Sequence, residues 1–79
     1  MSRNDVSEVV MKHICKVGIT SDPEKRSLLV VLTKLERGLI NGMTKYDMLK
    51  LMNKLYQGND PVIQQVLKEI AESKEFQEW

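Results

Sequence analysis

Apolar residues recur at helical spacing through four stretches of this chain, between Val6 and Ile70. Within each stretch they return every three or four residues, which places them on one face of an α-helix that must be buried. No stretch alternates apolar and polar residues for long enough to predict a β-strand. The pattern therefore predicts an all-α fold, a compact four-helix domain with short connections, with helices near residues 5–17, 22–40, 44–57 and 61–73.

Two of these helices are predicted to begin at an Asp-Pro pair, Asp22-Pro23 and Asp60-Pro61. The Asp side chain accepts hydrogen bonds from backbone N–H groups that the first helical turn leaves unpaired. A proline in the first helical position costs nothing, because the N–H group that it lacks has no partner there. These pairs are the strongest start signals in the chain.

The other two helices are predicted to begin at polar caps without a proline. We expect Asp5 to cap the first helix, with Glu8 three residues later as its partner in a capping box. Thr44 is expected to cap the third helix, with Asp47 in its first turn.

The predicted helix at residues 22–40 is apolar over much of its circumference, so we expect it to be central and the most buried. Its core stripe is Leu28, Val31, Leu32, Leu35 and Leu39, and Leu29 and Val30 fall outside this stripe. The other inner faces are Val6, Val9, Val10, His13, Ile14 and Val17; then Met48, Leu51, Met52, Leu55 and Tyr56; and finally Val62, Ile63, Val66, Leu67 and Ile70.

A chain of 79 residues with 42% apolar and 29% charged side chains has the composition of one globular domain, residues 1–79. At this length a single core stabilises the fold only marginally, and self-association would bury more apolar surface. Leu29, Val30 and Ile40 lie off the core stripe of their helix. The sequence therefore predicts a homodimer with two-fold symmetry.

The net charge of +1 provides no general attraction to nucleic acid or to a membrane. Residues 21–59 carry seven basic and four acidic side chains, whereas residues 60–79 carry two basic and five acidic ones. The longest apolar run, residues 28–32, is far too short to span a membrane. No apolar signal region is visible near Met1, and a lone cysteine forms no internal disulfide, so we expect a cytoplasmic protein.

The only His and the only Cys of the chain, His13 and Cys15, lie two positions apart. On a helix such residues point roughly 160–200° apart, so they can neither hold one metal ion together nor act as a nucleophile and its base. No glycine belongs to a phosphate-binding pattern. We therefore expect no enzyme, no cofactor and no metal site, and we expect His13 to lie at the core edge or to make a pH-sensitive contact.

Two groups of residues are candidates for binding a protein partner. Met11 and Cys15 form an apolar pair four residues apart, on the face of the first helix opposite its valines. Either this helix is sandwiched within its own chain or that second face meets another chain. Phe76 and Trp79 are the aromatic residues of the acidic end, and they either dock on the domain or anchor a partner.

The second and third predicted helices, joined by a turn that contains glycine, resemble a helix-turn-helix in outline. The exposed basic face of the third helix and its approach supplies the residue types that contact phosphates and base edges. These nucleic-acid candidates are Arg37, Lys45, Tyr46, Lys50, Asn53 and Lys54. The connection at residues 38–43 is longer than the usual three to four residues, and Asp47 on the same face would repel phosphate.

Two functions follow as hypotheses. The first is a small non-enzymatic regulator or adaptor that acts by binding another protein, of the kind that phages and other mobile elements often encode. The alternative is a helix-turn-helix-like DNA-binding regulator that uses the basic face of the third helix. The low net charge and the acidic end favour protein binding, because phosphate neutralisation dominates affinity for DNA.

Overall fold

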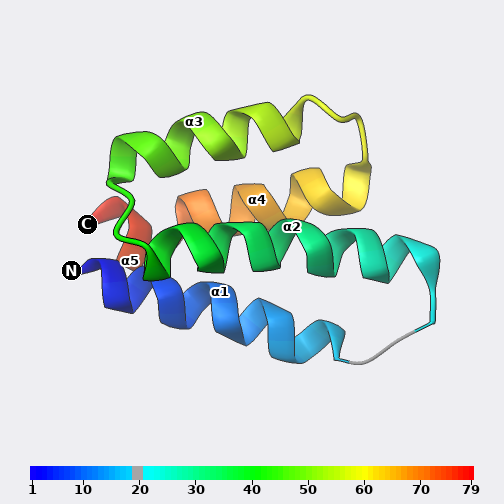
Figure 1. Cartoon of the computed structure of the whole chain (residues 1–79). Helices are drawn as coiled ribbons and strands as arrows, with labels where there is room; N and C mark the ends of the chain where they lie inside the picture. Colours follow the sequence, from blue (N-terminus) through cyan, green and yellow to red (C-terminus); the bar gives the residue numbers. More distant parts are fainter. Residues whose placement is uncertain (19–20) are drawn as a thin grey trace.

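The secondary structure of this chain is helical in the computed structural model, which describes residues 1–18 and 21–79. No strand occurs in that described part, so the predicted all-α fold is confirmed. The four predicted helices are all present, and a short fifth one that the sequence did not predict follows them (Figure 1). They are α1 (Arg3–Val17), α2 (Pro23–Ile40), α3 (Lys45–Tyr56), α4 (Pro61–Glu72) and α5 (Lys74–Gln77).

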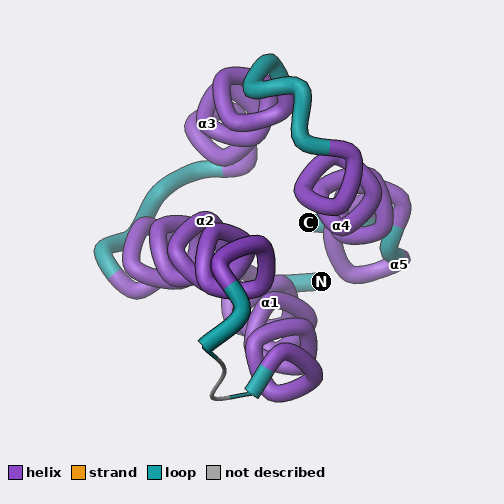
Figure 2. The backbone as a smooth tube through the Cα atoms, turned by 90° about the vertical axis from the view of Figure 1, so that its right-hand side faces the viewer, coloured by secondary structure: helices purple, strands orange, loops and turns teal. Residues whose placement is uncertain are grey.

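The four long helices run alternately in opposite directions, and each lies beside the one that follows it in the chain (Figure 1). Seen along their axes they surround a common centre, with α1 opposite α3 and α2 opposite α4 (Figure 2). The most extensive contact joins α1 to α2. The short helix α5 lies at the end of the bundle where both termini are found, beside the start of α1.

The core is centred on α2, as predicted. All five residues of its predicted stripe are buried, and α2 contributes more buried residues than any other described helix. The buried apolar residues are Val6, Val10, Leu28, Val31, Leu32, Leu35, Leu39, Met48, Met52, Leu67, Ile70 and Phe76.

Two residues that the pattern assigned to the core are exposed instead. Tyr56 of α3 is 46% exposed and Val62 of α4 is 43% exposed. Each lies eight positions from a fully buried residue, Tyr56 from Met48 and Val62 from Ile70. Eight positions turn an α-helix by about 80° from the starting direction, so both side chains lie on the flank of their helix. The inward prediction was therefore wrong for both.

The start of α1 also differs from the prediction, because the cap is Ser2 and not Asp5. Asp5 is the acidic partner of the capping box, and its Oδ2 accepts a hydrogen bond of 2.8 Å from the backbone N–H of Ser2. That hydrogen bond lowers the pKa of Asp5 below its ordinary value of 3.8, because it favours the charged carboxylate. The Ser-x-x-Asp spacing was present in the sequence, and it outweighed the Asp5–Glu8 pair.

The end of α4 is set by Ser73, which is also the cap of α5. Its hydroxyl donates to the carbonyl of Ile70 at 2.6 Å and accepts a hydrogen bond from the N–H of Phe76 at 3.3 Å. If α4 had continued, Phe76 would lie about 240° around the axis from Ile70, pointing away from the core. The break at Ser73 redirects the chain, and Phe76 becomes 2% exposed.

Replacement of Phe76 by Ala is expected to lower the free energy of unfolding by about 3–5 kcal/mol, because it removes a fully packed aromatic side chain. Urea unfolding followed by circular dichroism measures this change. The matched control is Val30→Ala, at a side chain that is 56% exposed. The control should change stability by less than about 0.5 kcal/mol. Equal effects of the two substitutions would contradict the burial of α5 against the bundle.

Candidate functional site

Exposed apolar side chains gather on the outward flank of α3. Tyr46 is 66% exposed, Leu49 is 44% exposed and Tyr56 is 46% exposed. Together with Asn53 they follow one another at intervals of three, four and three residues, so they form one stripe along the helix. Tyrosine is one of the residue types that contribute most to the energy of protein interfaces.

This stripe borders a groove between α3 and α4, which we call the α3–α4 groove. The groove has a volume of about 240 Å³. Its floor includes the buried side chains of Met52 and Leu67, which also belong to the core. Its lining consists of Leu49, Met52, Asn53, Tyr56, Leu67, Lys68 and Ala71. The site is therefore an apolar surface with two polar side chains at its edges.

The polar side chains at the groove are available to a ligand. Within residues 1–18 and 21–79, the side chains of Asn53 and Lys68 make no hydrogen bond or ion pair with the protein. Both are exposed. Farther along α3, the ammonium group of Lys50 lies 5.1 Å from the centre of the Tyr46 ring, a distance typical of a cation–π contact.

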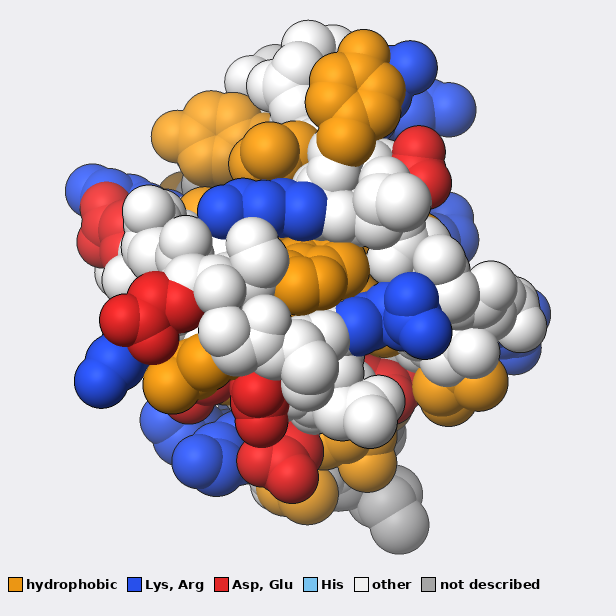
Figure 3. Space-filling model, turned by 90° about the vertical axis from the view of Figure 1, so that its left-hand side faces the viewer, with side chains coloured by type: hydrophobic (Ala, Val, Ile, Leu, Met, Phe, Trp, Pro, Cys, Tyr) orange, Lys and Arg blue, Asp and Glu red, His pale blue; other side chains and the backbone are white. Residues whose placement is uncertain are grey.

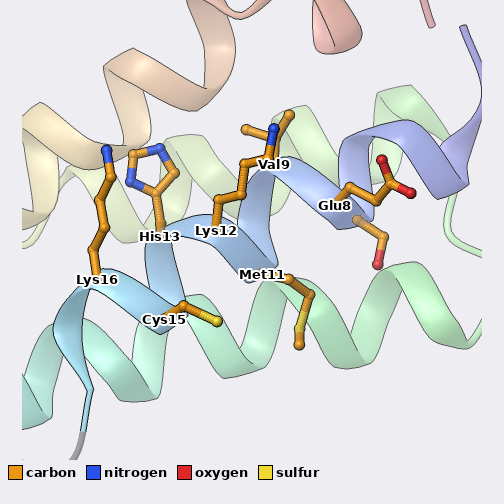
Figure 4. A pocket seen from close by; sticks show the side chains of 8 residues that line it. Glu8, Val9, Met11, Lys12, His13, Cys15 and Lys16 are labelled. Carbon is orange, nitrogen blue, oxygen red and sulfur yellow. The ribbon is translucent and has the colours of Figure 1, made fainter.

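A second hollow of about 570 Å³ follows the outer surface of α1, and the described residues that line it all belong to this helix. Met11, which is 44% exposed, and Cys15 lie along one side of α1, while His13 and Lys16 point away to the other (Figure 4). The second apolar face of α1 is thus not sandwiched in the described chain. A hollow over the convex surface of a single helix encloses little of a ligand.

His13 lies on the side of α1 that faces α4. Its Nδ1 atom is 4.0 Å from Oε2 of Glu69, and its side chain is 15% exposed. Both residues border a hollow of about 280 Å³ that also includes Lys16, Lys25 and Val62. In the described part of the chain no three His, Cys, Asp or Glu residues come together as metal ligands. His13 therefore lies at the edge of the core, one of the two roles predicted for it.

The aromatic residues of the acidic end dock on their own chain. Phe76 is buried, and the half-buried Trp79 meets it edge-on, with 6.1 Å between ring centres. The ammonium group of Lys45 lies 5.2 Å from the centre of the Phe76 ring. Figure 3 views this end of the molecule, where an apolar patch lies at the middle of the face with basic side chains beside it and acidic ones below it.

The nucleic-acid candidates do not all lie on one face: Tyr46, Lys50, Asn53 and Lys54 are exposed along one side of α3, whereas Arg37 belongs to α2. Lys45 is turned toward α5, where its Nζ donates to the carbonyl of Gln77 at 3.3 Å. Asn53 lines the α3–α4 groove, Lys50 and Tyr46 pack together farther along α3, and Lys54 and Arg37 are exposed outside the groove lining. In addition, α2 and α3 lie antiparallel (Figures 1 and 2), whereas the helices of a helix-turn-helix meet at about 90–120°.

Sequence reasoning missed Leu49 and Tyr56 as site residues. The signal was present in the spacing of Tyr46, Leu49, Asn53 and Tyr56, which forms a second stripe next to the buried one. The contribution of α4 to the groove was not visible, because it depends on which flank of α4 packs beside α3. Lys68 could be assigned only once that packing was known.

No protein-family model matches the sequence, and neither curated proteins nor solved structures match it. None of the described helices combines the length and the apolar composition needed to cross a lipid bilayer. The function is therefore argued from the surface of the molecule itself.

Alanine substitutions at the rim and at the floor of the groove should differ in their effect on the free energy of unfolding. Leu49→Ala is expected to change the free energy of unfolding by less than about 1 kcal/mol, because this residue is already 44% exposed in the folded chain. Met52→Ala, at a residue that is 5% exposed, is the comparison. It should cost about 2–5 kcal/mol through the cavity that it leaves. Similar losses for both variants in chemical denaturation would show that Leu49 serves the fold and is not free for a ligand.

Proposed function

We propose that this chain is a non-enzymatic regulatory or adaptor domain that acts by binding another protein, and that the α3–α4 groove is its binding surface. The observation that carries the proposal is the exposed stripe of Tyr46, Leu49 and Tyr56 beside a groove with an apolar floor. Exposed apolar side chains that are scattered singly are ordinary, but a continuous set at a groove is typical of a protein-binding surface.

The groove suits a protein better than a nucleic acid. Its lining is mainly apolar, and Lys68 is its only charged member among the described residues. A surface for nucleic acid requires several cations placed to neutralise phosphates. Here Lys45 is engaged with α5, and the net charge of the chain is only +1.

The absence of a catalytic role is part of the same proposal. His13 and Cys15 lie on different sides of α1 (Figure 4), and Nδ1 of His13 is 4.0 Å from Oε2 of Glu69 on α4. Cys15 is a free, exposed cysteine, and it lies on the side of α1 away from His13 (Figure 4). We also infer a cytoplasmic setting, in which a free exposed thiol persists in its reduced form.

Self-association stays a prediction, and we infer that the exposed apolar residues of α2 would take part in it. Val30 is 56% exposed and Ile40 is 74% exposed, both on α2 and away from the α3–α4 groove. A homodimer through α2 would therefore leave the groove free for a different protein, so the two kinds of binding are compatible.

A photo-crosslinking amino acid at position 49 tests the proposed site directly. The variant with a benzophenone side chain in place of Leu49 is illuminated in an extract of the cells that produce the protein. We expect one specific adduct, formed by a partner that occupies the groove. Adding Tyr56→Ala should abolish this adduct, because Tyr56 also lines the groove and its loss weakens binding of the partner there. The same side chain in place of Val30, an exposed residue of α2, is the matched control and should not give this adduct.

Two results would count against the proposed function. One is the same adduct from both positions, which indicates a contact that does not depend on the groove. The other is an adduct at position 49 that contains only two copies of this 9.1 kDa chain, which would make the groove a dimer interface.

A further inference from the structure

We propose that the occupant of the α3–α4 groove is an amphipathic helix of its partner with acidic residues beside its apolar stripe. This inference rests on the proposed function, since it names the chemistry of the segment that the same groove accepts. Two properties of the groove carry it: the length and periodicity of its apolar edge, and the sign of the charges around it.

The apolar edge of the groove has the dimensions of a short helix. From Tyr46 to Tyr56 the chain advances ten residues, which corresponds to about 15 Å along α3. A partner helix laid along this edge needs about three turns to cover it. Its apolar residues would recur every three or four positions, the spacing by which helices fill such grooves.

Lys68 of α4 is the one charged side chain among the described residues that line the groove, and none of those residues is Asp or Glu. Lys50 of α3 lies outside this lining, over the ring of Tyr46 in the exposed stripe. The acidic Glu69 of α4 does not offset Lys68, because it faces α1 and lies 4.0 Å from His13. Carboxylates on the partner would therefore meet the ammonium group of Lys68 at the groove and that of Lys50 beside Tyr46, at the start of the exposed stripe.

Asn53 is a second reason to expect that the partner helix carries polar groups beside its own apolar stripe. Its side chain lines the groove between Leu49 and Tyr56 and makes no hydrogen bond within the described residues. The two amide hydrogens of this side chain can donate to a carboxylate. A fully apolar partner would cover this amide without supplying an acceptor, and leaving a polar group buried and unpaired weakens binding.

The test uses two synthetic helical peptides of roughly 14 residues, about four turns, that share the same leucines at helical spacing. One peptide carries Glu beside the leucines and the other carries Lys. Each is titrated into the isotopically labelled full chain, and the amide signals of the protein are followed by nuclear magnetic resonance. We expect the Glu peptide to shift signals of α3 and α4 around Leu49 and Ala71, and the Lys peptide to leave them unchanged.

Two double variants with the same change in net charge separate local from general electrostatics. Lys50→Glu with Lys68→Glu should weaken binding of the Glu peptide about ten-fold, because two favourable charge pairs are replaced by repulsion. Lys16→Glu with Lys25→Glu reverses two cations at the hollow between α1, α2 and α4. This control should bind the Glu peptide as the unaltered chain does.

Three outcomes would overturn the inference. Equal binding of the two peptides would show that charge does not select the occupant. Shifts confined to α1 and α2, or no shift with either peptide, would show that the groove does not accept an acidic helix. The crosslink from position 49 is scored independently, so the proposed protein-binding function can hold when this inference fails.

Discussion

The burial of one apolar stripe on α2 is the interaction on which the rest of this fold depends. Leu32 and Leu35 are fully buried at its centre, and α1 packs along α2 more extensively than any other pair of helices does. A chain of 79 residues has little core to spare. The helices α1, α3 and α4 each add two buried residues to the five of α2, and α3 packs on α4 less extensively than α1 packs on α2.

The less extensive packing of α3 on α4 explains where the candidate site lies. Met48 and Met52 of α3 and Leu67 and Ile70 of α4 point inward, but the flanks of both helices remain partly uncovered. Methionine at the floor of such a groove adapts to differently shaped partners, because its side chain is unbranched and flexible. The exposed apolar residues Leu49 and Tyr56 line the groove between α3 and α4, whereas Val30 and Ile40 of α2 lie apart from it.

Much of the fold could be predicted from the sequence, because its signals are local. The stripe of α2 follows directly from helical periodicity, and Asp22 and Asp60 cap their helices as the Asp-Pro pairs indicated. The fifth helix could not be predicted in the same way. It depends on the balance between one more turn of α4 and the burial of Phe76, which is a property of the assembled bundle. The groove was missed for the same reason, since three of its seven described lining residues come from the flank of α4 that faces α3.

The central claim is that partner binding takes place between α3 and α4. The rate of amide hydrogen exchange tests it most directly. The chain is compared alone and in complex with the protein captured through position 49. Binding to the groove should slow exchange in α3 and α4, because the partner suppresses local opening of these helices. Exchange in α1 and in the first half of α2 should stay unchanged. Protection that appears along α1, around Met11 and Cys15, with none in α3 or α4, would contradict the account.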